Sequence, residues 1–180
     1  MIYSLCWLAV HGKVTDMILD ELQLRRTGER EKIPSKLAGA DLPTGWYVIV
    51  KDQDVELMRD TLLKEVSLQC ECVACFIEDA SRTTSAVGWK NGRKVWSALH
   101  DGQQGKEHLL LRGEFPSLFG PILEGFRAKQ KANPGADFIF EIPLELAREL
   151  SGYRHDRPVV SKEAQPFEIL KWVPEKKGKK

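Results

Sequence analysis

The sequence predicts an α+β protein built as one compact unit. The chain has 180 residues, which is about the length of a single domain. Its composition, with 42% hydrophobic and 29% charged residues, is that of an ordinary globular chain rather than a disordered or collagen-like one. Runs of β-branched and aromatic residues alternate with helical spacing in the first half, and hairpin signals dominate the second half.

The first half of the chain, residues 1–80, predicts the element order βαββαβ. Strands are expected at residues 3–10, 26–32, 45–51 and 69–78, and helices at residues 14–22 and 55–66. This is the order of a ferredoxin-like, split-βαβ unit. The segment between the second and third strands, residues 33–44, is rich in proline, glycine and alanine, so we expect a surface loop there.

The second half is expected to continue as an antiparallel hairpin and meander with two further helices. Asn91-Gly92 is a strong signal for a two-residue hairpin turn. Such a turn pairs Val87 with Trp96 and places both on one face together with Trp89, Ala98 and His100. The remaining expected elements are strands at 107–111 and 138–142, helices after Ser117 and from Pro143 to Leu150, and an edge strand in the late apolar cluster 167–173.

Residues 1–174 are expected to form the domain, either as one unit or as two packed halves, 1–80 and 81–174. Charge is nearly balanced, with 27 basic and 26 acidic residues, so no strong field of one sign directs the chain to nucleic acid. The run of lysines in residues 175–180 predicts a disordered basic tail. Contact with nucleic acid through this tail is the second alternative function.

Four cysteines are present, and three of them fall within six residues. Cys72 and Cys75 have the spacing of a zinc knuckle. On a strand, however, Cys70 and Cys72 point to one face and Cys75 to the other. We therefore expect these thiols, together with Cys6, to be reduced core residues, and a metal site on Cys70, Cys72 and Cys75 is the alternative.

Two His-Asp pairs, His100-Asp101 and His155-Asp156, are the candidate catalytic residues. Histidine titrates near neutral pH and suits acid–base chemistry or metal binding. Adjacent residues on a strand nevertheless point to opposite faces, and each pair lies where turn or helix-end chemistry is expected. No nucleophile elbow, P-loop or dinucleotide fingerprint is present, so no cofactor is expected.

Several motifs together resemble a family of small uncharacterised bacterial proteins. These motifs cover residues 3–156 and are Trp7-Leu8-Ala9-Val10 with Gly12-Lys13, Leu24-Arg25-Arg26-Thr27-Gly28-Glu29, Leu42-Pro43-Thr44-Gly45-Trp46-Tyr47, Val73-Ala74-Cys75-Phe76-Ile77-Glu78, Trp89 to Trp96, His100-Asp101, and Phe140-Glu141-Ile142-Pro143-Leu144-Glu145-Leu146-Ala147 running to His155-Asp156. The resemblance implies a bacterial, cytosolic protein and brings no catalytic residues with it. Small bacterial proteins of this kind include immunity proteins that neutralise a toxin.

The leading hypothesis is a non-enzymatic cytoplasmic module that binds another protein. The segment 33–44 is suited to surface recognition. The opening residues 1–10 lack a positive n-region, and no apolar run reaches the ~20 residues of a membrane span. The first alternative is a small metal-dependent or hydrolytic enzyme that uses His100, Asp101, His155 and Asp156.

Overall fold

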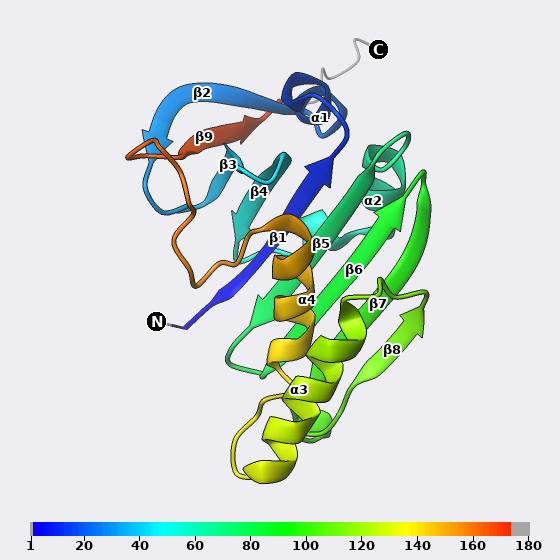
Figure 1. Ribbon diagram of the computed structural model, residues 1–180. Coiled ribbons are helices and arrows are strands. Elements are labelled where there is room, and N and C mark those ends of the chain that lie inside the picture. The colour runs from blue at the N-terminus through cyan, green and yellow to red at the C-terminus, as the bar shows by residue number, and fades with distance from the viewer. Residues whose placement is uncertain (1, 174–180) are drawn as a thin grey trace, which may run out of the picture.

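The computed structural model describes residues 2–173, in which all strands join one antiparallel sheet (Figure 1). The basic tail expected at residues 175–180 lies outside the described residues. The order across the sheet is β2-β9-β3-β4-β1-β5-β6-β7-β8. The strands are β1 (Ser4–His11), β2 (Leu24–Glu31), β3 (Leu37–Asp41), β4 (Trp46–Asp52), β5 (Glu71–Glu78), β6 (Thr83–Lys90), β7 (Arg93–Asp101), β8 (Leu110–Gly113) and β9 (Phe167–Trp172). The chain is thus α+β, with both sequence halves contributing to the same sheet.

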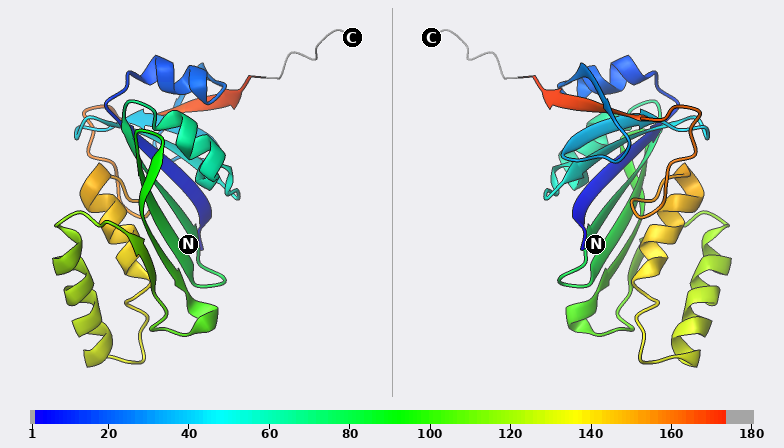
Figure 2. Two further views of the ribbon diagram at one scale, coloured as in Figure 1. Left: turned by 90° about the vertical axis from the view of Figure 1, so that its right-hand side faces the viewer. Right: turned by 90° about the vertical axis from the view of Figure 1, so that its left-hand side faces the viewer.

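Helices cover both faces of this sheet, as the side views in Figure 2 show. The helices are α1 (Thr15–Glu21), α2 (Asp60–Val66), α3 (Phe119–Ala132) and α4 (Glu141–Ser151), and two short 3-10 turns are η1 (Glu56–Met58) and η2 (Gly102–Gln104). Because side chains alternate along a strand, β1 sends Trp7 into the core beneath α4 and Leu8 into the core beneath α1 and α2. No described helix is both long enough and apolar enough to cross a membrane.

The first half follows the ferredoxin-like order only in part. β1 lies between β4 and β5, as that order requires, but β2 is not next to β4. The expected loop contains β3, which pairs with β4 from Leu37 to Asp41. Alanine and glycine in β3 have low strand propensity, so the sequence pattern does not indicate a strand. The packing requires glycine at position 39, because a Cβ on Gly39 would lie 2.1 Å from the Tyr47 hydroxyl.

The late apolar cluster forms β9, which is an interior strand and not the expected edge strand. β9 pairs with β2 on one side and with β3 on the other. Phe167 and Leu170 are buried in opposite cores, one on each face of the sheet. β9 contributes to both cores, and β3 covers its second edge at Glu168 and Ile169, so the strand is more deeply integrated than its position near the C-terminus suggests.

The hairpin of β6 and β7 has the expected turn, with Lys90 opposite Arg93. Its register then shifts between Gly88 and Trp89, so that Trp96 lies opposite Gly88 and Val87 lies opposite Ser97. Trp96 therefore enters the core beneath α4, whereas Val87 and Trp89 enter the other core. The expected single face is wrong because a β-bulge inserts one residue into β7.

The chain differs from the expected elements again before α4. Instead of a strand, residues 138–140 form a turn and residues 141–142 begin α4, and Glu141 N donates to the Phe138 carbonyl at 3.2 Å. Pro143 lies in the first turn, where its missing N–H costs nothing. Gly152 closes the helix as expected, with φ of 84°. The strand expected at residues 107–111 begins later, as β8.

Candidate functional site

His100 lies fully buried on β7, in a group of polar side chains beside the turn η2. Its Nδ1 lies 2.7 Å from the His108 carbonyl, which can only accept, so Nδ1 carries a proton. Its Nε2 lies 3.3 Å from Asp137 Oδ2, which also faces Arg82 Nε at 3.3 Å. The Phe140 ring packs edge-on against the imidazole. This group joins β6, β7 and the start of α4, and leaves no opening toward the imidazole.

Asp101 points away from His100 and serves the turn that follows. Its carboxylate accepts hydrogen bonds from the Gln103 amide at 3.0 Å and from Gln104 Nε2 at 2.8 Å. The Gln104 side chain contributes most to lowering the pKa of Asp101. Its own N–H donates to His108 Nδ1 at 2.9 Å. These contacts are those of an aspartate that caps a turn.

His155 follows α4 and packs edge-on against Tyr3, with ring centroids 4.5 Å apart. Burial lowers the pKa of His155 to about 4, so the imidazole is neutral at physiological pH. Its Nδ1 is buried and has no hydrogen-bond partner among the described residues. A buried polar atom without a partner costs free energy, and Nδ1 has almost no surface from which a bound group could reach it.

Asp156 forms an ion pair with Arg154 and not with His155. The Arg154 side chain is only 7% exposed and lies 2.7 Å from Asp156, 2.5 Å from Glu141 and 3.3 Å from Glu145. Burial works against the charge of Arg154, but the hydrogen bonds that Arg154 donates to Asp156 and Glu141 outweigh it and raise the pKa of Arg154. The two His-Asp pairs share no hydrogen-bonded, ion-paired or stacked residue, and the structure does not combine them into one centre.

An apolar cavity of about 540 Å³ opens beside His155, and we call it the apolar trough. Its walls come from the start of β1, the segment that enters β3, and the segment between α4 and β9. The lining residues are Tyr3, Lys32, Ile33, Pro34, Tyr153, His155, Asp156, Arg157, Pro158, Val159, Glu163, Ala164, Pro166 and Phe167. Apolar walls with a few polar groups are typical of a binding site.

At the mouth of the trough, the acidic side chains are paired within the chain and the basic side chains are left largely free. Asp156 pairs with Arg154, and Glu163 pairs with Arg30. Lys32 is exposed and forms no ion pair with the described residues, and the nearest carboxylate to Arg157 is 4.0 Å away, on Glu145. The charge available to a ligand at the mouth is therefore positive.

The cysteines are distributed as the strand pattern predicts. Cys70 and Cys72 enter the core beneath α1 and α2 together with Cys6, and Cys75 enters the core beneath α4. Burial raises the pKa of all four thiols, and that of Cys6 to about 12. All four are unpaired. Thiols in this state are poor nucleophiles and poor metal ligands.

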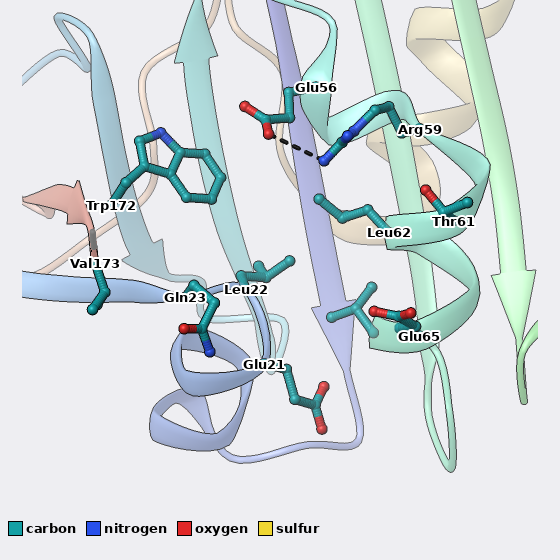
Figure 3. A pocket seen from close by; sticks show the side chains of 11 residues that line it. Glu21, Leu22, Gln23, Glu56, Arg59, Thr61, Leu62, Glu65, Trp172 and Val173 are labelled. Atoms are coloured by element: carbon teal, nitrogen blue, oxygen red, sulfur yellow. Dashed lines mark hydrogen bonds and ion pairs between the residues drawn. The ribbon is translucent and has the colours of Figure 1, made fainter. Parts of the chain in front are cut away.

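A second, more open hollow of about 450 Å³ lies between α1 and α2 on the other face of the sheet (Figure 3). Its floor is formed by Leu22, Leu62 and Val66. Figure 3 shows Glu21 on the α1 side and Glu65 on the α2 side.

Comparison of the chain with protein-family models, with curated protein sequences and with solved structures finds no match.

The sequence pointed to His155 and Asp156 as candidate residues but not to the apolar trough beside them. The wall of the trough opposite these two residues includes Ile33 and Pro34, which lie more than a hundred residues away in the chain. The one local signal was the composition of the segment 33–44, which combines apolar residues with proline. Only the pairing of β9 with β2 and β3 brings this segment against the residues that follow α4.

Proposed function

We propose that this chain is a cytoplasmic protein-binding module, and that the apolar trough is where it holds its partner. The observation that supports the proposal is an apolar cavity that is lined by one exposed aliphatic side chain and has two more next to its lining residues in the chain. Ile33 lines the trough and is 69% exposed, and Ile2 and Val160 adjoin lining residues and are 81% and 80% exposed. Exposed apolar groups gathered around a cavity are typical of protein interaction sites.

The chemistry of the trough indicates what the partner presents. A cavity of about 540 Å³ has room for one or two large apolar side chains, which act as anchors in protein interfaces. Lys32 and Arg157 at the mouth favour acidic residues next to those anchors. The partner segment is therefore expected to carry a large apolar residue flanked by aspartate or glutamate.

Affinity capture from lysate of the source organism tests the proposal. The wild-type chain should retain a stoichiometric protein that the Ile33→Asp variant does not retain, because a carboxylate at the mouth opposes burial and repels an acidic segment. The matched control is Val14→Asp, which adds the same charge at an equally exposed valine beside α1. The control should retain the partner as the wild type does.

The two other outcomes are equally informative. If the wild type retains nothing beyond what Ile33→Asp retains, the protein-binding proposal is wrong for this site. If a partner is retained and is toxic when expressed without this chain, the module is an immunity protein, which is the specific form that the sequence motifs suggest.

A further inference from the structure

A third cavity, of about 470 Å³, shares no lining residue with the apolar trough, and we call it the tryptophan pocket. Trp46 and Trp96 line it, and both belong to the core beneath α4. Phe115, from the segment between β8 and α3, packs against the Trp96 ring with centroids 5.7 Å apart. The volume lies within the range of ~300–1,000 Å³ that is typical of small-molecule sites. The tryptophan pocket is therefore a candidate ligand site separate from the proposed protein-binding site.

The indole N–H of Trp96 reaches the wall of this pocket without an acceptor. Trp96 is only 5% exposed, and its Nε1 makes no hydrogen bond within residues 2–173. A Cβ on Gly88 would lie 2.2 Å from this Nε1, and Gly88 also lines the pocket. Trp7 Nε1 lacks an acceptor as well, but it is fully enclosed by protein, whereas Trp96 Nε1 is not. An indole N–H can only donate, so a ligand that fills the pocket has to supply an acceptor.

A second free donor lies on the other wall of the pocket. Trp46 is 9% exposed, and its Nε1 is neither enclosed nor hydrogen-bonded to a described residue. The strands that carry Trp46 and Trp96, β4 and β7, are separated by β1, β5 and β6. Between them, the His11 ring stacks on Trp46 with centroids 5.2 Å apart, and its Nδ1 lies 3.2 Å from Glu71 Oε1. The pocket thus presents two indole donors on different strands and an imidazole that Glu71 holds in place.

Carboxylates at the rim supply acceptors and leave little net charge. Glu71 lies between His11 and Lys90, at distances of 3.2 and 3.9 Å. Glu114 lines the pocket, is exposed, and forms no ion pair in the described part of the chain. An anionic ligand would meet the two glutamates, and a cationic ligand would meet Lys90. The lining therefore favours a neutral ligand.

The walls also distinguish among neutral ligands. A purely apolar ligand would leave both indole N–H groups and the Glu114 carboxylate without partners. A flat aromatic ligand needs an open ring face on which to stack, and both tryptophans are more than nine-tenths buried. The hydroxyl groups of a sugar both donate and accept. Its C–H groups can pack against Val73, Leu150 and Phe115, which form the apolar part of the lining.

We propose that the tryptophan pocket binds a neutral sugar of one or two rings. Sugar hydroxyl groups accept hydrogen bonds from the indole N–H groups of Trp96 and Trp46 and donate to the carboxylate of Glu114. The face of the His11 ring turned away from Trp46 receives the C–H face of the sugar. This site does not depend on the apolar trough, so the sugar and the protein partner bind to different surfaces.

Nuclear magnetic resonance of the full chain tests the proposal. Glucose, galactose, mannose, N-acetylglucosamine and cellobiose are each titrated to millimolar concentrations. At least one of them should shift the indole N–H signals of Trp46 and Trp96 in a saturable way. The indole signal of Trp7 should not move, because its Nε1 is enclosed. If none of these sugars shifts the signals of Trp46 and Trp96, the proposal is wrong.

Two variants test the individual contacts with the sugar that binds. Trp96→Phe keeps an aromatic ring and removes the indole N–H, and it should raise the Kd about fivefold, the value of one hydrogen bond. Glu114→Gln changes an exposed side chain and should raise the Kd by a similar factor, because hydrogen bonds to a charged acceptor are stronger than those to a neutral one. The matched controls Trp172→Phe and Glu107→Gln lie outside the pocket and should bind as the wild type does. Equal effects of pocket and control variants contradict the assignment.

Other ligand classes and the apolar trough give separate outcomes. Saturable shifts of the same indole signals by adenosine or by a hexaproline peptide, with none by a sugar, would assign the pocket to a planar base or a polyproline segment and overturn the proposal. Ile33→Asp at the apolar trough should leave sugar binding unchanged. Loss of sugar binding in Ile33→Asp would show that the two sites are one and would also overturn it.

Discussion

Burial changes the chemistry of His155 more than the neighbouring Asp156 does. In the sequence the two residues look like a possible acid–base pair, but the carboxylate of Asp156 is held by Arg154 at 2.7 Å. Desolvation beside Tyr3 then dominates and lowers the pKa of His155 to about 4. His100 and Asp101 are separated in the same way, since each has its own hydrogen-bond partners.

The lowered pKa of His155 predicts a pH-dependent stability. The pKa of His155 is about 4 in the folded chain and 6.5 for an ordinary histidine, so between these values the unfolded chain binds more protons. The free energy of unfolding should therefore rise from pH 4 to pH 6.5 through this group and stay constant above. The contribution is about 3 kcal/mol.

Replacement of the imidazole isolates this contribution. His155→Phe keeps an aromatic ring against Tyr3 and removes the titrating group, so urea unfolding should show a smaller rise between pH 4 and 6.5 than in the wild type. Val159→Ala changes the same trough without a titrating group and should keep the wild-type rise. A His155→Phe profile parallel to that of the wild type would refute the assignment.

At the scale of elements, the bulge between Gly88 and Trp89 decides which core each tryptophan enters. The sequence predicts the Asn91-Gly92 turn but cannot predict the bulge, because an extra residue in β7 is favoured only by packing on both faces. The bulge places Trp96 opposite Gly88. The indole then lies over the glycine, and a Cβ there would be 2.2 Å from Trp96 Nε1.

Gly88→Ala is therefore expected to lower the free energy of unfolding by about 1–3 kcal/mol, the usual cost of overpacking. Gly120→Ala in α3 is the control, because its Cβ would meet no atom within 4 Å and alanine favours helix by up to ~1 kcal/mol over glycine. Chemical denaturation measures both variants. The double variant Gly88→Ala, Trp96→Leu should recover stability relative to what the two single changes predict together. A neutral Gly88→Ala would mean that the indole does not lie over this glycine.

For the whole molecule, β9 joins the sheet after all other strands and still lies inside it. Its partners β2 and β3 come from the first 41 residues, so the C-terminal part of the chain holds the N-terminal strands together. The same insertion brings Phe167 and Pro166 against Ile33 and Pro34 and creates the apolar trough. The fold and the candidate site thus depend on one long-range pairing.

Amide hydrogen exchange can measure this integration. β9 lies between β2 and β3 at Glu168 and Ile169, so the successive amides of β9 around these two residues should all exchange slowly. The edge strand β2 serves as the internal control, and alternate amides on its free edge should exchange much faster. An alternating fast and slow pattern in β9 would contradict its interior position.

Local pattern in the sequence determined the α+β class, the βαβ start, the Asn91-Gly92 hairpin, the Gly152 helix end and the opposite faces of Cys72 and Cys75. These features depend on alternation, turn chemistry and helix spacing, which act between neighbours in the chain. Tertiary structure alone decided that Leu37–Asp41 is a strand, that β9 is interior and that Trp96 and Trp89 enter different cores. The physical reason is that small residues, late apolar residues and bulges are placed by partners far away in the sequence, whose packing and hydrogen bonds outweigh local preference.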